Sequence, residues 1–299
     1  MLKKVQIISP SDGITKIPRE VTEETKNKLE QKTNLSVKFS KNLFEKFDVE
    51  KVLEDIYDAY FDKEVDLIMC YKGGWYAKEL LNRLDFEIIE KNKKPMIGYS
   101  DNTILLNAIY LKTGQKNYYG PTFSAFNMDK GFEFTLQNFN KVVRDKGKFK
   151  INISKEYSYD KKWYINQEDR VFIKNENMQI INKGEATGIL LGGHLSSFAY
   201  LLSNGFEVKD SDVILALEED GKQEEYLIQF KNKLEEIMCN IGKNRIKAIL
   251  IGRSEKPISC KQWKNMLQTL DLDIPIICNL DFGHTTPTLS IPIGEKIKI

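Results

Sequence analysis

The stretch VDLIMCYKGGWYAKELLNRLDFEIIEKNKKPMIGYSDNTILLNAIYLKTG, residues 65–114, decides the fold. It contains two short, mainly apolar runs, 65–70 and 95–98, which are typical of parallel strands buried on both faces. A Gly-Gly turn and leucines at helical spacing follow the first run. The second run leads to Ser100 and then to a helical segment that stops at Gly114. The stretch therefore predicts strand, helix, strand and helix in succession, the unit of a mostly parallel sheet.

The same alternation continues on both sides of this stretch. Apolar runs at 5–9 and 35–40 predict two earlier strands, and the rhythm resumes after Gly184. The strands expected there are residues 187–193, 212–219, 246–252 and 274–280, separated by helices at 194–202, at 222–240 and around Trp263. The sequence thus predicts the α/β class with two lobes. The N-terminal lobe would be a mostly parallel sheet flanked by helices, and the C-terminal lobe a second α/β unit.

The middle of the chain has a different character. Residues 145–185 are polar and aromatic, without a clear hydrophobic period. We therefore expect three parts: an N-terminal α/β domain over 1–150 that contains Ser100, a linker and mobile loop over 151–185, and a C-terminal α/β domain over 186–299.

Composition narrows the class of protein. Of the 299 residues, 41% are hydrophobic, which is enough for one large core or two smaller ones. The 45 Lys and Arg residues nearly balance 43 Asp and Glu residues, which argues against a dedicated nucleic-acid-binding protein. No apolar run approaches the roughly 20 residues that span a bilayer, and the first run is too short for a signal peptide. The four scattered cysteines each lie in or beside an apolar run, which favours buried free thiols and a reducing compartment, so we expect a cytoplasmic protein.

Ser100 is the first candidate for chemistry. A serine in a turn from strand to helix resembles a nucleophile elbow, where the amides of the following helix face a developing oxyanion. Serine is also a favoured N-cap residue, so a purely structural role stays open. Asn102 stands where the G-x-S-x-G pattern has its second glycine, so the standard elbow signature is absent.

The two histidines limit the choice of a base. Only His194 and His284 are present, so a Ser–His mechanism must use one of them. His284 lies in the loop DFGHTTP after an expected strand, where a positioned base would be found, although a purely structural loop histidine stays open. His194 follows two glycines and opens an apolar helix, so we expect a packing role or a helix-terminal role for it.

Carboxylates and glycines at strand ends are further candidates. Glu218 and Glu219 end an apolar run, and alternation directs one of them into the crevice, where it could orient a histidine. Gly73 and Gly74 could bring a backbone N–H close to a substrate carbonyl, although tight turns use the same pair. The chain has no recognisable metal-ligand motif, Walker loop or dinucleotide fingerprint, so no metal and no cofactor are expected.

Several separated motifs agree in their order with one family. They are SPSDG, YKGGWYAKELLNRLDFEII, KPMIGYSDNTILLNAIYLKTG, YYGPTFSAF, GEATGILLGGHLSS, ILALEED, LIGR and DFGHTTPTLSIPIG. This set resembles the LD-carboxypeptidase family, and it is most similar to the branch of microcin C immunity proteins. The resemblance covers nearly the whole chain.

The resemblance implies a serine peptidase or amidase with its active site between the two lobes. It assigns the catalytic triad to Ser100, Glu218 and His284. It assigns the oxyanion hole to the backbone N–H of Asp101 together with that of Gly73 or Gly74. These and the following expectations come from the family's motifs.

The substrate stays open between two classes. The immunity branch implies hydrolysis of an amide in a peptidyl or aminoacyl nucleotide-like compound. The wider family implies removal of the terminal D-alanine from murein tetrapeptide. A small-molecule binding protein that cleaves nothing is a third alternative. The family expectation for assembly is a homodimer.

Three residues are candidates for substrate contact. Arg253 follows an expected strand and could bind a terminal carboxylate, but a structural ion pair stays equally open. Trp163 belongs to an aromatic cluster with Tyr157, Tyr159 and Tyr164, which could stack on a nucleobase or could pack one lobe against the other. Trp75 departs from the small or polar residues of many relatives, as His194 departs from the usual asparagine, and both could alter the pocket.

Overall fold

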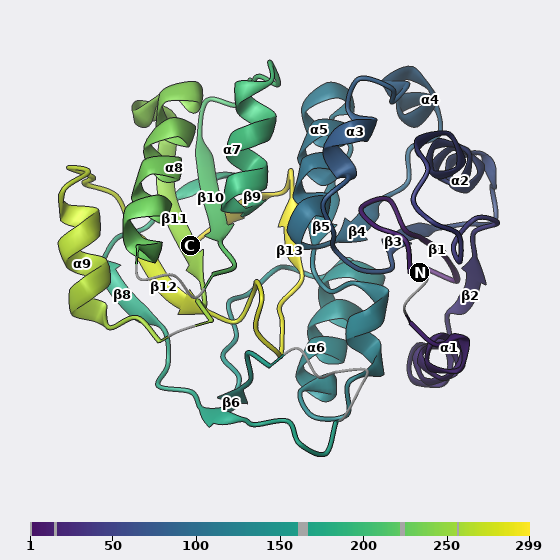
Figure 1. Cartoon of the computed structure of the whole chain (residues 1–299). Helices are drawn as coiled ribbons and strands as arrows, with labels where there is room; N and C mark the ends of the chain where they lie inside the picture. Colours follow the sequence, from purple (N-terminus) through teal and green to yellow (C-terminus); the bar gives the residue numbers. More distant parts are fainter. Residues whose placement is uncertain (1, 15–16, 161–166, 222–224, 256) are drawn as a thin grey trace.

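The computed structural model describes residues 2–14, 17–160, 167–221, 225–255 and 257–299. Within these ranges the chain forms two six-stranded sheets that lie side by side, each with its own helices (Figure 1). A two-stranded ribbon of β6 (Glu156–Tyr157) and β7 (Ile173–Lys174) lies below them. The α/β class and the two-domain arrangement predicted from the sequence are confirmed.

The first sheet has the order β13-β5-β4-β3-β1-β2. Its strands β1 to β5 run parallel, and β13 pairs antiparallel with β5. The strands are β1 (Lys4–Ile8), β2 (Ser36–Phe39), β3 (Leu67–Cys70), β4 (Met96–Gly98), β5 (Asn117–Tyr119) and β13 (Ile291–Ile293). The helices are α1 (Arg19–Thr33), α2 (Val49–Phe61), α3 (Ala77–Leu80), α4 (Phe86–Lys91), α5 (Thr103–Thr113) and α6 (Phe132–Phe139). Every residue of β3 and β4 is buried, because helices cover both faces of the sheet.

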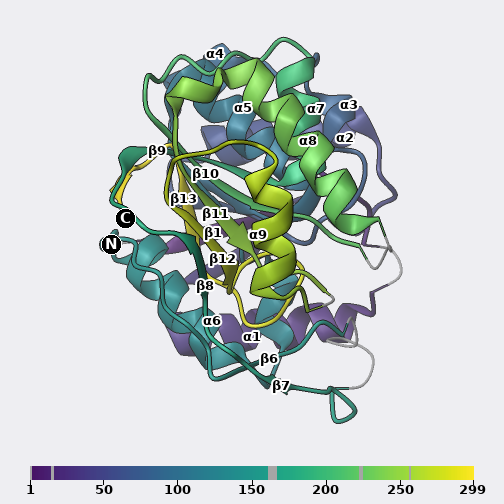
Figure 2. The same cartoon turned by 90° about the vertical axis from the view of Figure 1, so that its left-hand side faces the viewer.

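The second sheet has the order β14-β9-β10-β11-β12-β8. Strands β9 to β12 are parallel, and the edge strands β14 and β8 are antiparallel to their neighbours. The strands are β8 (Gln179–Asn182), β9 (Thr187–His194), β10 (Val213–Glu218), β11 (Ile246–Gly252), β12 (Ile276–Leu280) and β14 (Lys296–Lys298). The helices are α7 (Leu195–Ser203), α8 (Tyr226–Ile241) and α9 (Cys260–Gln268). Figure 2 looks onto α8 and α9, which lie over the strands of this sheet.

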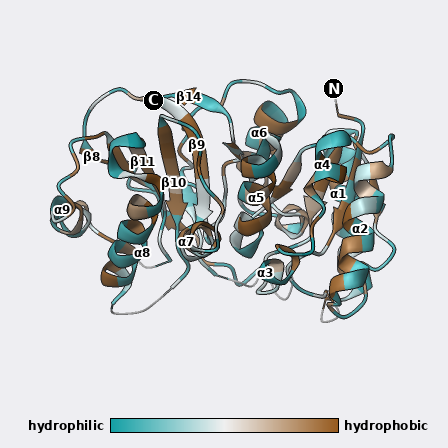
Figure 3. Ribbon diagram, turned by 90° about the horizontal axis from the view of Figure 1, so that it is seen from above, coloured by the Kyte–Doolittle hydropathy of each residue, from teal (hydrophilic) through white to brown (hydrophobic). Residues whose placement is uncertain are grey.

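One helix joins the two sheets. Nearly all of α5 is buried, because it packs against α7 and β9 of the second domain as well as its own sheet. A single apolar cluster therefore runs through both domains, from Ile104 and Leu105 of α5 to Phe198 of α7 and Leu217 of β10. Figure 3 shows the apolar strands β10 and β11 in brown beside α7 and α8.

The structure differs from the expected elements at two places. The single helix expected from Leu80, Leu81 and Leu84 is two short helices, because the Asp85 side chain accepts the amide N–H groups of Glu87 and Ile88 and so begins α4.

The expected domain boundaries at residues 151 and 186 also do not coincide with the limits of the two sheets. Strand β8 lies inside the segment expected to be a linker, yet it pairs with β12. Strand β13 lies in the last part of the chain but belongs to the first sheet.

The helices and the cysteines bear on the environment of the protein. Among the described residues, every helix is too short or too polar to cross a lipid bilayer. Cys70 and Cys278 are buried free thiols, as expected, whereas Cys239 and Cys260 are free but exposed, so the expectation of burial is wrong for these two.

Candidate active site

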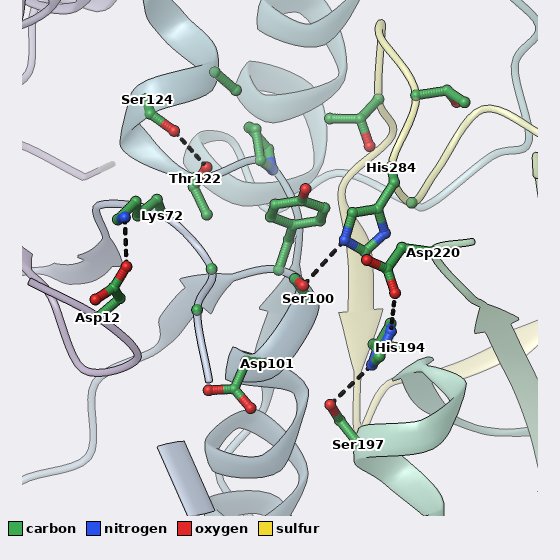
Figure 4. Close-up of a pocket in the computed structure, with 18 of the residues that line it drawn as sticks. Asp12, Lys72, Ser100, Asp101, Thr122, Ser124, His194, Ser197, Asp220 and His284 are labelled. Atoms are coloured by element: carbon green, nitrogen blue, oxygen red, sulfur yellow. Dashed lines mark hydrogen bonds and ion pairs between the residues drawn. The ribbon is translucent and has the colours of Figure 1, made fainter. Parts of the chain in front are cut away.

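A cavity of about 600 Å³ lies between the two domains. It is lined by the turn after β3, the start of α5, the end of β9 and the loop after β12, so it collects the carboxyl ends of strands from both sheets. Ser100, Asp101, Gly73, Gly74 and His284 all lie in its wall. Figure 4 shows Ser100 at its centre, with Lys72 and Asp12 on one side and His284, Asp220 and His194 on the other.

Ser100 has an unusual backbone. It begins a short 3₁₀ helix at Ser100–Asn102 that leads from β4 into α5, and its φ is +60°. A positive φ is uncommon for a residue with a side chain and is typical of tight functional turns. The serine therefore stands on a sharp strand-to-helix turn, as the nucleophile of an elbow does, although Asn102 replaces the usual glycine.

Ser100, His284 and Glu218 form a continuous chain of hydrogen bonds. Oγ of Ser100 lies 3.1 Å from Nε2 of His284, and Nδ1 of His284 lies 2.8 Å from Oε2 of Glu218. Because an ionised carboxylate only accepts, Nδ1–H donates to Glu218, and this leaves Nε2 to accept from the serine. These three residues come from the end of β4, the loop after β12 and the end of β10.

Glu218 is charged although it is fully buried. Burial by itself raises the pKa of its carboxyl group, but the charge and hydrogen bond of His284, the charge of His194 and the hydroxyl of Tyr119 together hold that pKa below its ordinary value. The carboxylate is therefore available to stabilise a protonated imidazole beside it.

The sequence did not indicate Tyr119 as a site residue. Its hydroxyl accepts the Ser100 backbone N–H at 3.0 Å and donates to Oε1 of Glu218. The residue reaches the site because β5 pairs with β4, which sets Tyr119 opposite Gly98. Strand pairing between separate segments carries no local sequence signal, so only the motif YYGP pointed to this stretch.

The two glycines have different neighbours. A Cβ on Gly73 would lie 2.7 Å from Cβ of Ser100, whereas one on Gly74 would lie 2.1 Å from the carbonyl oxygen of Ser11. Gly73 therefore lets the turn after β3 pass directly beside the serine, and Gly74 lets it pass beside Ser11. The Asp101 carboxylate accepts the backbone N–H of Ala77 at 2.8 Å, so it is oriented toward the start of α3.

His194 stands at the N-terminus of α7, as expected, and it also belongs to the site. It lines the cavity, its Nε2 lies 2.7 Å from Glu219 and 3.2 Å from Asp220, and its Nδ1 lies 2.9 Å from Oγ of Ser197. Burial lowers its pKa, but the two carboxylates outweigh that effect and raise it to about 10.

His194, Glu219 and Asp220 are also the group of described residues whose donor atoms come close enough to bind a metal ion. Because the imidazole nitrogens are protonated at neutral pH, we interpret the group as a charged hydrogen-bond cluster beside His284. The two histidine rings lie 5.6 Å apart.

The residues expected to contact substrate differ in their exposure and surroundings. Arg253 is only 2% exposed, forms an ion pair of 2.9 Å with Asp281 and packs on the ring of Tyr157, which favours a structural ion pair, and its contact with substrate stays a prediction. Tyr157 is buried beneath it, and Trp163 lies outside the described residues. Trp75 lines the cavity and is 74% exposed.

The fold and this arrangement define a class of protein, the serine hydrolases built from two α/β domains. Comparisons with known proteins identify the family within that class. The model of the LD-carboxypeptidase N-terminal domain matches residues 5–120, and that of the C-terminal domain matches residues 187–299. The chain therefore belongs to the LD-carboxypeptidase family.

Individual relatives agree with this assignment. A protein of Treponema pallidum named "Putative carboxypeptidase" is 34% identical and covers 99% of this chain and 89% of its own. The microcin C7 self-immunity protein MccF of Escherichia coli is 26% identical over 82% of this chain and 74% of its own. The crystal structure of an MccF-like protein from Bacillus anthracis superposes with a TM-score of 0.93 at 33% identity, covering 99% of this chain and 93% of that one.

Proposed function

We propose that the protein is a serine amidase whose triad is Ser100, His284 and Glu218. We further propose that it hydrolyses the amide bond of a peptidyl or aminoacyl nucleotide-like compound of the microcin C type. The observation that carries the proposal is the hydrogen-bonded chain from Ser100 Oγ through His284 to the buried Glu218 carboxylate, opening into the cavity between the domains.

The reaction would begin with attack of Ser100 Oγ on the amide carbonyl. Nε2 of His284 takes the serine proton, and Glu218 stabilises the imidazolium that forms. The backbone N–H groups of Asp101 and Gly73 stabilise the oxyanion, each by about 3 kcal/mol when well placed. We assign the second donor to Gly73 because it is the glycine that packs against Ser100.

The second half of the cycle returns the enzyme to its starting state. His284 gives its proton to the leaving amine, and the acyl group stays bonded to Ser100. A water molecule then gives a proton to His284 and attacks the ester, which releases the acid and restores the serine hydroxyl.

The nucleotide-like substrate is supported by the pocket. A cavity of about 600 Å³ lies within the size range of small-molecule sites, and the exposed Trp75 indole at its wall offers a face on which a nucleobase can stack. Structures of MccF, 21% identical to this chain, contain aspartyl sulfamoyl adenosine and glutamyl sulfamoyl guanosine. We transfer that ligand class to this chain as part of the proposal.

A second candidate is removal of the terminal D-alanine from murein tetrapeptide. A Bacillus subtilis relative, 25% identical, is named "Probable murein peptide carboxypeptidase". An exopeptidase requires a cation near the terminal carboxylate of its substrate, and Lys78 in the cavity wall could supply it in place of Arg253. A homodimer and a cytoplasmic location belong to the same proposal.

The test is to incubate the purified protein separately with murein tetrapeptide and with a sulfamoyl-linked aminoacyl adenosine, and to identify the products by mass. We expect cleavage of the adenosine compound, and a loss of about 10⁴-fold or more in kcat for Ser100→Ala and for His284→Ala. Thermal unfolding of both variants controls for folding.

Each result decides between the candidates. Cleavage of the tetrapeptide alone would favour the carboxypeptidase. Ligand-induced stabilisation without any product would favour the non-catalytic binding protein. Undiminished hydrolysis by either variant would refute the triad.

A further inference from the structure

We infer that Tyr119 is a positioning residue for the proposed triad, because its hydroxyl joins the backbone of the nucleophile to the carboxylate that orients the base. This inference rests on the proposed function. It assigns a role to a residue outside the three that the family's motifs indicate.

Four residues form a closed ring of hydrogen bonds. The Ser100 N–H donates to the Tyr119 hydroxyl, and that hydroxyl donates to Oε1 of Glu218. Oε2 of Glu218 accepts from His284, whose other nitrogen returns to Oγ of Ser100. Ser100 follows β4 and Tyr119 ends β5 in the first sheet, whereas Glu218 ends β10 and His284 follows β12 in the second, so the ring closes across the domain boundary.

The ring holds the carboxylate in one orientation. A carboxylate has two oxygens, and here each oxygen has a different partner, Tyr119 on Oε1 and His284 on Oε2. If the phenol hydroxyl were missing, Oε1 would be left buried without this donor, and the carboxylate would be free to rotate away from His284.

The ring also supports the serine turn. The N–H of Ser100 is taken up by Tyr119, so this amide does not compete with the amides of Asp101 and Gly73 for the oxyanion. The same bond fixes the residue whose φ is +60°, a conformation that requires support from its surroundings.

The Tyr119 side chain is tightly enclosed by its neighbours. Tyr119 is 1% exposed. A Cβ on Gly193 would lie 2.8 Å from its ring, so the glycine at the end of β9 permits the ring to pass toward Glu218. Burial raises the pKa of the phenol well above its ordinary value, and the neighbouring Glu218 carboxylate adds to this, so the hydroxyl stays protonated and can donate.

The test is the Tyr119→Phe variant, which keeps the ring and removes the hydroxyl. We expect kcat to fall about 10- to 100-fold with KM changed by less than about two-fold, since the lost hydrogen bond is to a charged group. The matched control is Tyr110→Phe, which removes a hydroxyl that donates to the carboxylate of Asp210 at 3.1 Å, away from the cavity.

A spectroscopic measurement makes the test independent of any substrate. The chain has two histidines, so ¹⁵N-histidine labelling with His194→Asn for assignment isolates the Nδ1–H proton of His284. We expect this proton to give a low-field signal in the parent and in Tyr110→Phe, and to exchange faster with water in Tyr119→Phe.

An unchanged signal together with unchanged kcat in Tyr119→Phe would overturn the inference. That result would leave the proposed function intact if Ser100→Ala still abolishes hydrolysis. If the parent hydrolyses neither substrate, the proposed function fails, whereas the His284 signal still decides whether Tyr119 orients the Glu218–His284 pair.

Discussion

At the scale of single residues, Asn102 explains how this serine turn works without the usual second glycine. Its side-chain amide donates to the carbonyl oxygens of Lys72 and Tyr99, each at 3.0 Å, and its oxygen accepts from Ser11 at 2.7 Å. A Cβ on Gly98 would lie 2.9 Å from Cβ of Asn102. The asparagine thus ties the turn after β3 to the turn after β4, and so sets Gly73 against Ser100.

His194 provides a prediction about stability and pH. The ordinary pKa of histidine is 6.5, and the two carboxylates raise the pKa of His194 to about 10 against the effect of burial. Folding therefore gains most from this group below pH 6.5, and the gain is lost as the pH rises from 6.5 through 10.

We expect the difference in free energy of unfolding between the parent and His194→Asn to be largest near pH 6. It should shrink at higher pH, by at most about 1.4 kcal/mol per pH unit. Urea unfolding at several pH values measures this difference in free energy. The contributions of the other titratable groups largely cancel, because both proteins contain them. A difference that stays constant from pH 6 to pH 10 would contradict the charged cluster.

Residue types and strand ends allowed part of the site to be predicted. Histidine scarcity and the loop after β12 pointed to His284, and the turn after β4 pointed to Ser100, which the structure brings within 3.1 Å of each other. Tyr119 could not be predicted in the same way. Its approach to Glu218 depends on which strand pairs with β4 and on how the two domains pack, and neither is a local property of the chain.

At the scale of elements, the ends of β11 and β12 carry a structural ion pair. Arg253 follows β11 and bonds to Asp281, which also accepts the N–H of Ser154 at 2.7 Å and its hydroxyl at 2.9 Å. The loop that carries His284 is therefore anchored to the segment before β6. Exposure could not be predicted for Arg253, because strand-end arginines occur both in pockets and in buried pairs.

We expect Arg253→Ala to lower the free energy of unfolding by about 3–5 kcal/mol, because it leaves the buried Asp281 charge without its cation. The control Arg83→Ala breaks an exposed pair with Glu50 and should cost about 1 kcal/mol or less. Thermal unfolding compares the two. A normal stability with a selective rise in KM for substrates that end in a carboxylate would instead support the substrate-binding role.

At the scale of the whole molecule, the last part of the chain links both sheets. Strand β13 pairs with β5 of the first sheet, and β14 pairs with β9 of the second. Side chains of α5 add further links, since Asn107 donates to the Gly192 carbonyl at 2.8 Å and the Thr103 hydroxyl accepts the His194 N–H at 2.9 Å. The two domains are therefore expected to unfold together.

We expect calorimetry to show one transition for both domains. Ile293→Ala, at a fully buried position of β13, should lower the free energy of unfolding by about 2–5 kcal/mol without splitting that transition. Lys298→Ala, at an exposed position of β14, is the control and should change little. Two separate transitions, in the parent or in Ile293→Ala, would show that the domains fold independently.

The return of β13 to the first sheet also has a consequence for synthesis. A ribosome releases the chain from its N-terminus, and most domains complete their folding in that order. Here β5 has an open edge until residues 291–293 emerge, almost 300 residues after the first strand began. Because Tyr119 lies on that strand, the nascent N-terminal half needs protection from pairing with other chains until residues 291–293 have emerged.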